Sequence, residues 1–399
     1  MKIRQFILFV VSLWSSTASF AWAQADSTFV EAADSNVHAL RLRIGADAFF
    51  IDNEYNSPTF KGYTLPGVRV RPVLTYDPLK DIHLELGAEA LFFHGARHYP
   101  NYAYHDISSW KGHQYTSGLH VIPWFRTDAS IGPATFTLGA LHQRDTGFHD
   151  LALPLYNPEC SYSADPEMGI EGRIKVSHYT LDAWVDWQSF IYKGDTHQEA
   201  FTGGVTQSIH FTPDAKKKEG LSVSMPLQVL FQHRGGEIDN THTGAQTLCN
   251  LGGGLRAEWR QHKGVVRSAG CEILPMKSEQ LSGNLWAKKH GTGVWGSTWL
   301  NLWDRADARL GYLWGNNFRS LYGAPFFHNG GIAHVGSYYV GYTQPFKNAD
   351  ESVHKHRFFL SFGLQGYIVN NAGQTNHSLS VCLAFHADMN FLLKRFAHN

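Results

Sequence analysis

The sequence predicts an all-β protein, a transmembrane up-and-down antiparallel β-barrel of about 16 strands (14–18) that follows a cleaved signal peptide. Three observations predict it. Aromatic residues make up 14% of the 399 residues and charged residues only 17%, below the roughly 25% usual for soluble domains. Long segments alternate apolar and polar residues with period two. Short and long connections between these segments also alternate, as they do in bacterial outer-membrane barrels.

The N-terminus has the features of a secretory signal. Lys2 and Arg4 precede an apolar run, QFILFVVSLW, that is too short to span a bilayer. Small residues follow at Ala21 and Ala23, so we expect cleavage after Ala23, with Ala25 as the alternative. The chain should therefore be exported.

This organisation divides the chain into three parts. We expect a signal peptide over 1–23, a short periplasmic segment over 24–37 and an outer-membrane barrel over 38–399. The cell outer membrane is the predicted location.

The first barrel strand shows the alternation most clearly. In LRLRIGADAFFID, Leu40, Leu42 and Ile44 share one face with Ala46, Ala48 and Phe50, whereas the other face is largely polar. Such a pattern indicates a strand with an apolar face and a polar face. Similar segments occur at 68–76, 82–92, 170–176, 179–187, 221–231, 358–364 and 379–391.

The apolar face should contact lipid. Several segments have five to seven consecutive apolar positions, which suits the roughly 9–11 residues that a tilted membrane strand needs. A soluble sandwich is the alternative, but its strands are mostly shorter. At the outward position Leu227 an arginine should destabilise the barrel, whereas at the inward position Gln228 it should be nearly neutral.

The connections predict the orientation. Both termini should lie in the periplasm, with the long loops 95–114, 143–166 and 233–247 outside the cell. Cys160 should then react with an impermeant thiol reagent, unless its loop folds inward.

The polar face should line the lumen with charges of both signs. Short turns predict that Arg69 lies opposite Glu89, Arg173 opposite Asp182 and Glu258 opposite Arg267. The predicted lumen-lining residues are Arg41, Arg43, Asp47, Arg69, Arg71, His83, Glu85, Glu89, Arg173, Lys175, Asp182, Asp186, Arg256, Glu258 and Arg260. These residues could tune the passage of a solute, or they could simply pair within a plugged interior.

We expect no catalytic, metal or cofactor site and no enzyme activity. Ser208 and His210 share a strand face, but no third group completes a nucleophilic site beside them. The histidines lack metal-site spacing. Lys and Arg together equal Asp and Glu at 34 each, which argues against a nucleic-acid partner.

Two segments carry a family resemblance. The stretches DAWVDWQSFIYKGDTHQEAFTGG (182–204) and PLQVLFQHRGGEID (226–239) resemble a family of porin-like outer-membrane β-barrels of Bacteroidota. The resemblance implies an exported barrel in the outer membrane. It assigns no activity and no catalytic residue.

The sequence therefore favours a porin-like channel for passive or selective uptake of small polar solutes. The alternatives are a barrel enzyme that acts on lipid or glycan and a closed structural or adhesin-type barrel. The expected partners are outer-membrane lipid, small polar solutes and the barrel-assembly machinery.

Overall fold

A computed structural model describes residues 37–56, 62–94, 118–142, 148–212, 219–235, 244–304, 306–324, 327–338, 342–345, 354–371 and 374–396. The predicted signal peptide, nearly all of the predicted periplasmic segment and the loop 95–114 lie outside these residues. Among the described residues, no helix is both long enough and apolar enough to cross a bilayer.

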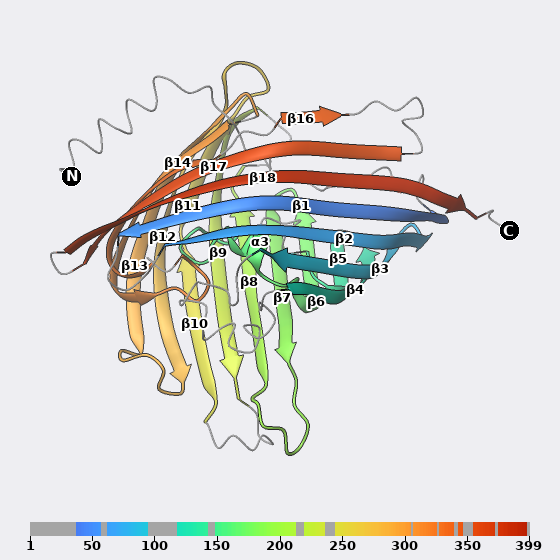
Figure 1. Ribbon diagram of the computed structural model, residues 1–399. Coiled ribbons are helices and arrows are strands. Elements are labelled where there is room, and N and C mark those ends of the chain that lie inside the picture. Colours follow the sequence, from blue (N-terminus) through green and yellow to red (C-terminus); the bar gives the residue numbers. More distant parts are fainter. Residues whose placement is uncertain are drawn as a thin grey trace.

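The described chain forms one antiparallel sheet and a short helix (Figure 1). The elements are β1 (Ala39–Asn56), β2 (Tyr63–Leu79), β3 (Ile82–Phe93), β4 (Gly118–Ile131), β5 (Ala134–Ala140), α3 (Cys160–Ser163), β6 (Met168–Val176), β7 (Tyr179–Ser189), β8 (Ala200–His210), β9 (Gly220–Arg234), β10 (Gln246–Gly253), β11 (Leu255–Arg260), β12 (Val266–Ser282), β13 (His290–Leu302), β14 (Ala306–Arg319), β15 (His328–Tyr338), β16 (Tyr342–Pro345), β17 (His354–Asn371) and β18 (Gln374–Arg395).

The sheet closes into a barrel because β1 pairs with both β2 and β18. Two wall strands are interrupted. β10 and β11 both pair with β9 and β12, and β15 and β16 both pair with β17. The described residues thus form a barrel of 16 wall strands in up-and-down order, which confirms the predicted fold class.

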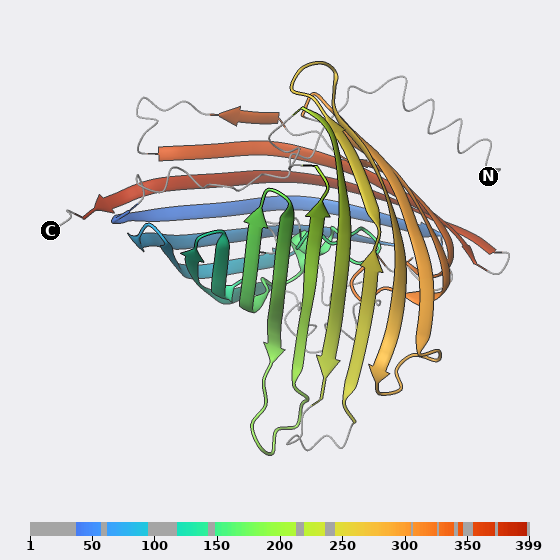
Figure 2. The ribbon, with the colours of Figure 1, turned by 180° about the vertical axis from the view of Figure 1, so that it is seen from behind.

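The two faces of the wall differ as the alternation predicted. In Figure 1, β1, β2 and β18 cross the front of the barrel, and Figure 2 shows β8 and β9 in the wall behind them. On the outer face, Leu86 is 66% exposed and Ile170 63%, whereas the inward Glu89 and Glu171 are 0% exposed. A closed barrel with an apolar outer face is how β-structure crosses a bilayer, so the predicted outer-membrane location is also confirmed.

The predicted register is correct at one of the three turns. Arg173 does lie opposite Asp182. Arg69 lies opposite Leu91 rather than Glu89, because β2 continues to Leu79 and the turn to β3 is formed by Lys80 and Asp81, later in the chain than the prediction required.

The third turn is longer than its sequence suggested. β11 ends at Arg260 and β12 begins at Val266, so Glu258 lies opposite Gly270. Arg267 instead forms an ion pair with the exposed Asp304.

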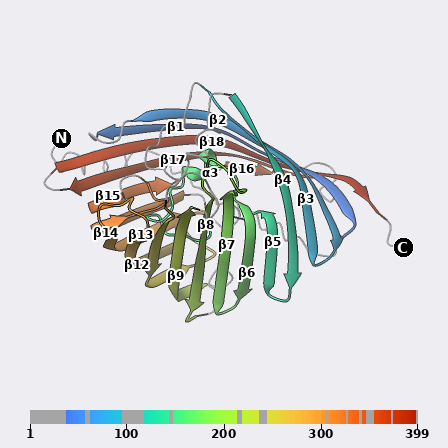
Figure 3. The ribbon, with the colours of Figure 1, turned by 90° about the horizontal axis from the view of Figure 1, so that it is seen from below.

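Two segments between strands fold into the barrel. Residues 148–167, which follow β5 and contain α3, lie inside the ring of strands (Figure 3). Residues 320–324 meet them there: the Asn157 amide donates to the Tyr322 carbonyl at 2.7 Å. Cys160 lies in this inward loop and is 7% exposed. The expected reaction with an impermeant thiol reagent was made conditional on the loop not folding inward, so it no longer applies.

The inward segment 148–167 packs against the wall on several sides. Leu153 and Leu155 join a buried cluster with Trp295, Leu313 and Tyr367 on β13, β14 and β17. Tyr162 joins a second cluster with Phe49, Leu65 and Leu91 on β1 to β3. The lumen therefore holds an apolar core at the level of these residues.

Gln228 corrects one expectation about the inner face. Its side chain is 1% exposed, accepts from the Ala152 amide at 3.0 Å and donates to the Asp150 carbonyl at 3.0 Å. An arginine there would break two buried contacts with the inward segment, so the substitution would not be neutral.

Candidate active site

A serine, a histidine and an aspartate form a chain of hydrogen bonds on the inner wall. The Ser361 hydroxyl lies 3.0 Å from Nε2 of His386, and Nδ1 of His386 lies 2.6 Å from Oδ1 of Asp47. With the imidazole proton on Nδ1, Nε2 can accept the hydroxyl proton. This is the order of groups in a serine hydrolase triad.

Three neighbouring strands hold the three side chains. Asp47 on β1 lies directly opposite His386 on β18. Ser361 on β17 lies opposite Ala384, two residues from His386 on the same face of β18. Ser361 and His386 point into the barrel because the residue before each of them points outward. Leu360 is 50% exposed and Phe385 is 45% exposed, and successive side chains of a strand lie on opposite faces.

Asp47 has a second partner that fixes its other oxygen. Nε of Arg69 donates to Oδ2 of Asp47 at 3.0 Å. The carboxylate therefore stays ionised and oriented, with Oδ1 directed at the imidazole.

The helix α3 covers these groups. The Tyr162 ring lies 5.0 Å from the ring of Phe49 and 6.1 Å from that of His386. The Ser161 carbonyl accepts from Arg69, which also binds Asp47. Ser361 is only 1% exposed, so in this conformation solvent does not reach its hydroxyl.

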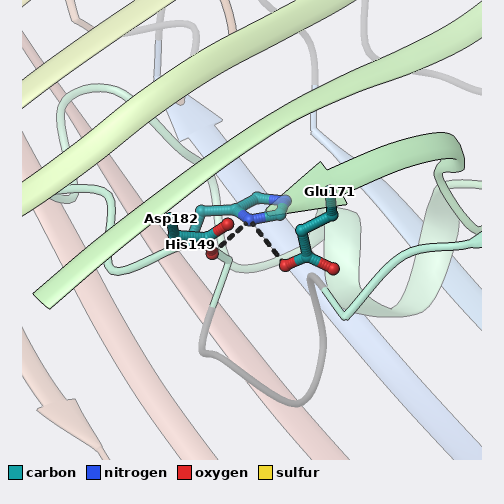
Figure 4. A group of neighbouring side chains, drawn as sticks. All are labelled: His149, Glu171 and Asp182. Atoms are coloured by element: carbon teal, nitrogen blue, oxygen red, sulfur yellow. Dashed lines mark hydrogen bonds and ion pairs between the residues drawn. The ribbon is translucent and has the colours of Figure 1, made fainter. Parts of the chain in front are cut away.

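A second polar cluster surrounds His149 on the inward segment (Figure 4). Nδ1 of His149 lies 2.7 Å from Asp182 on β7, and Nε2 lies 2.8 Å from Glu167. Glu171 on β6 lies 3.7 Å from Nδ1. Burial lowers the pKa of His149, but Glu167 and Asp182 outweigh it and raise the pKa to about 10. This histidine is protonated at neutral pH and is a poor general base.

The polar residues predicted for the lumen mostly lie in charged pairs. These join Arg43 to Asp388, Asp47 to Arg69, Arg71 to Glu89, His83 to Glu85, Arg173 to Glu171, Arg256 to Glu272 and Arg260 to Glu258. Arg41, Asp182 and Asp186 are buried, whereas Lys175 is exposed. The structure thus pairs charges of both signs; their role in solute selectivity stays a prediction.

The sequence analysis missed Ser361, His386 and His149. Alternation places Ser361 and His386 opposite the apolar positions of the last two strands. Their contact with Asp47, 339 residues before His386, depends on the register of the closing strand pair. No short motif joins them. For His149, a loop sequence does not reveal that the loop turns inward.

Solved structures with similar folds are outer-membrane proteins. The outer membrane protein opdK from Pseudomonas aeruginosa has a TM-score of 0.48 at 10% identity, over 89% of this chain and 100% of that chain. A BenF-like porin from Pseudomonas fluorescens Pf-5 has a TM-score of 0.46 at 8% identity, over 88% and 100%. OccAB4 from Acinetobacter baumannii has a TM-score of 0.46 at 11% identity, over 90% and 100%. No curated protein matches the sequence.

The family comparison overturns one prediction from sequence. The family model described as lipid A 3'-O-deacylase-type matches residues 31–396, nearly the whole chain. A deacylase family is a family of enzymes, so the expectation that this chain is not an enzyme is wrong. The expectation failed because it required a local motif, and the chain's hydrolase-like groups lie on three strands far apart in sequence. The chain belongs to the lipid A 3'-O-deacylase-type family.

Proposed function

We propose that this protein is an outer-membrane esterase that removes an ester-linked acyl chain from lipid A. The observation that carries the proposal is the family match over residues 31–396. The hydrogen-bonded series Ser361, His386 and Asp47 supports it, because ester hydrolysis needs a nucleophile, a base and a group that orients the base. Of the alternatives open from sequence, this is the enzyme that acts on lipid.

In the proposed reaction, Ser361 Oγ attacks the ester carbonyl while Nε2 of His386 takes the hydroxyl proton. The tetrahedral intermediate then expels the sugar oxygen, which takes that proton from His386. The products of this step are the deacylated glucosamine hydroxyl and an acyl-serine. Water, deprotonated by the same nitrogen, attacks the acyl-serine and releases the fatty acid with Ser361 restored.

Asp47 performs no proton transfer in this scheme. Its Oδ1 holds the proton of His386 on Nδ1 and stabilises the imidazolium that forms during attack. Arg69 fixes the same carboxylate from the other side. Both residues were predicted for the lumen wall, and in this scheme the ion pair that they form positions His386.

Substrate access requires α3 to move. Ser361 is 1% exposed beneath the segment that contains Tyr162, and this segment belongs to a connection between strands rather than to the wall. Displacement of Tyr162 would open the hydroxyl while the three strands keep their pairing. We therefore expect the wall to supply the reacting groups and α3 to control entry.

The test uses the purified full-length protein in detergent micelles with lipid A that carries its full set of ester-linked chains. Mass spectrometry should show loss of one acyl chain and an equal amount of free fatty acid. A fluorophosphonate probe should label wild type and should not label Ser361→Ala. If wild type leaves lipid A intact, the proposed activity fails; if Ser361→Ala hydrolyses at the wild-type rate, the site assignment fails.

Uptake of small polar solutes through the lumen is a separate hypothesis. The buried clusters formed by Leu155 and Tyr162 with the barrel wall do not favour a wide aqueous path through the described part of the barrel. Planar-bilayer conductance tests it directly. Stable single-channel currents from the pure protein would support a channel in addition to the esterase.

A further inference from the structure

The groups around His149 have the composition and spacing of a metal site. Nδ1 of His149, a carboxylate oxygen of Asp182 and one of Glu171 all lie within 4.8 Å of one another (Figure 4). Nδ1 is 2.7 Å from Asp182 Oδ2 and 3.7 Å from Glu171 Oε1. Ligands of a tetrahedral zinc ion, each about 2.0–2.1 Å from the metal, stand about 3.3 Å apart. The observed separations bracket that value.

Two carboxylate oxygens at this place lack hydrogen-bond partners. Among the described residues, none donates a hydrogen bond to Oε1 of Glu171 or Oδ1 of Asp182, although both atoms are buried. Glu171 is 0% exposed, and its other oxygen already accepts from the His142 amide at 2.9 Å. Arg173 approaches Oε1 only to 3.8 Å. A buried carboxylate oxygen without a donor is costly, and a bound cation would remove that cost.

The surroundings of the imidazole also suit a metal ligand. Nε2 of His149 lies 2.8 Å from Glu167, the carboxylate–histidine arrangement that fixes a ligating ring from its far side. The ring stacks on Trp184 with centroids 3.7 Å apart and an interplanar angle of 4°. These two contacts hold the ring in place, and a metal would leave them intact. The ion would replace only the Nδ1 proton that now lies between His149 and Asp182.

We propose that His149, Glu171 and Asp182 bind a divalent transition metal, with Zn²⁺ as the probe of choice. One nitrogen and two carboxylate oxygens form a ligand set that zinc accepts, with a fourth position left for water. His149 lies on the inward segment, while Glu171 and Asp182 lie on β6 and β7. The ion would therefore fasten that segment to the barrel wall. This site is separate from Ser361 and does not depend on the proposed esterase activity.

Metal content is the primary measurement. Full-length protein is stripped with chelator, equilibrated with Zn²⁺ and passed into metal-free buffer, and zinc is then counted by mass spectrometry. We expect about one zinc per chain in wild type. Glu171→Gln and Asp182→Asn should each bind zinc at least about tenfold more weakly, and Glu167→Gln about 10–100-fold more weakly.

Asp128→Asn is the matched control. Asp128 is also a buried carboxylate bonded to a histidine, 3.0 Å from Nε2 of His142, but it lies outside the proposed ligand set. It should keep wild-type zinc content. Folding of each variant is checked by its heat-dependent mobility on a denaturing gel.

A cobalt spectrum of the wild-type protein tests the ligand set even if a variant does not fold. Wild type with Co²⁺ should show visible bands of nitrogen and oxygen ligation without a thiolate charge-transfer band. Wild type that retains no metal, variants that retain it fully, or a thiolate band would each overturn the proposal.

Discussion

Two histidines inside the barrel, His386 and His149, stand in opposite chemical settings. His386 lies between one carboxylate and one hydroxyl, those of Asp47 and Ser361. His149 lies among three carboxylates, those of Glu167, Glu171 and Asp182. A single carboxylate orients an imidazole and leaves its second nitrogen free as a base. Three carboxylates keep an imidazole protonated, or together with it they form the ligand set of a metal ion.

On the two proposals above, this difference separates a histidine that takes part in a reaction from one that anchors a segment. His386 belongs to the wall, and its hydroxyl partner can act as a nucleophile. His149 belongs to the inward segment, and its partners hold that segment against β6 and β7. The same side chain thus serves two purposes, which its neighbours determine.

The largest expected effect is at the nucleophile. Ser361→Ala should lower the rate of lipid A deacylation on the order of 10⁶-fold, because the proposed acyl intermediate forms on Oγ of Ser361. Release of fatty acid from lipid A by the purified barrel measures it. Ser380→Ala is the matched control, since Ser380 is also a buried inward serine, 5% exposed, on the adjacent β18. A similar loss of activity in both variants would contradict the assignment of Ser361 as the nucleophile.

The next effect is at the orienting acid. Asp47→Asn should lower the deacylation rate about 10⁴-fold, because an amide no longer holds the imidazole proton on Nδ1. Asp388→Asn, which changes an inward aspartate of β18 paired with Arg43 at 3.0 Å, should stay within about tenfold of wild type. The ratio of the two rates is the measurement. Equal rates would show that Asp47 acts only as a scaffold.

The cover over the site gives a smaller effect. Tyr162→Ala should loosen α3 by about 3 kcal/mol, since it removes a fully buried ring from the cluster with Phe49. The thiol of Cys160, 7% exposed in the same helix, should then react at least about tenfold faster with a maleimide. Cys249, buried in β10, reports on general unfolding, and its rate should not change. An unchanged rate at Cys160 would contradict a movable cover.

The smallest effect is at the second histidine. His149→Gln should lower deacylation by less than about tenfold, whereas His386→Gln should abolish it on the scale of Ser361→Ala. Initial rates of both variants on the same lipid A preparation decide between them. A larger loss of deacylation in His149→Gln than in His386→Gln would mean that His149, rather than His386, is the catalytic base.

The barrel could be predicted because its evidence is local and repeated. Each strand such as β1 shows period two by itself, and the faces of Leu42 and Arg41 follow from that period. Register was less predictable. The turn at Lys80 and Asp81 lies slightly later in the chain than predicted, and it places Leu91 rather than Glu89 opposite Arg69.

The candidate site was beyond sequence reasoning for a related reason. Asp47 was predicted for the inner wall, but its contact with His386 forms only when the last strand pairs with the first. His149 depends on the path of a connection, which tertiary packing against Trp184 and Gln228 determines. The prediction that the chain is not an enzyme failed at this step.

The pairing of β1 with β18 has a consequence for biogenesis. These strands are the first and last of the barrel, so their ladder, from Ala39 with Arg395 to Asn56 with His377, is the seam that makes the cylinder continuous. Asp47 and His386 lie on opposite sides of that seam. On the proposed chemistry, a chain caught before closure has a serine without a working base and cannot attack the membrane lipids around it. Completion of the cylinder would then switch the proposed activity on, much as cleavage activates a zymogen.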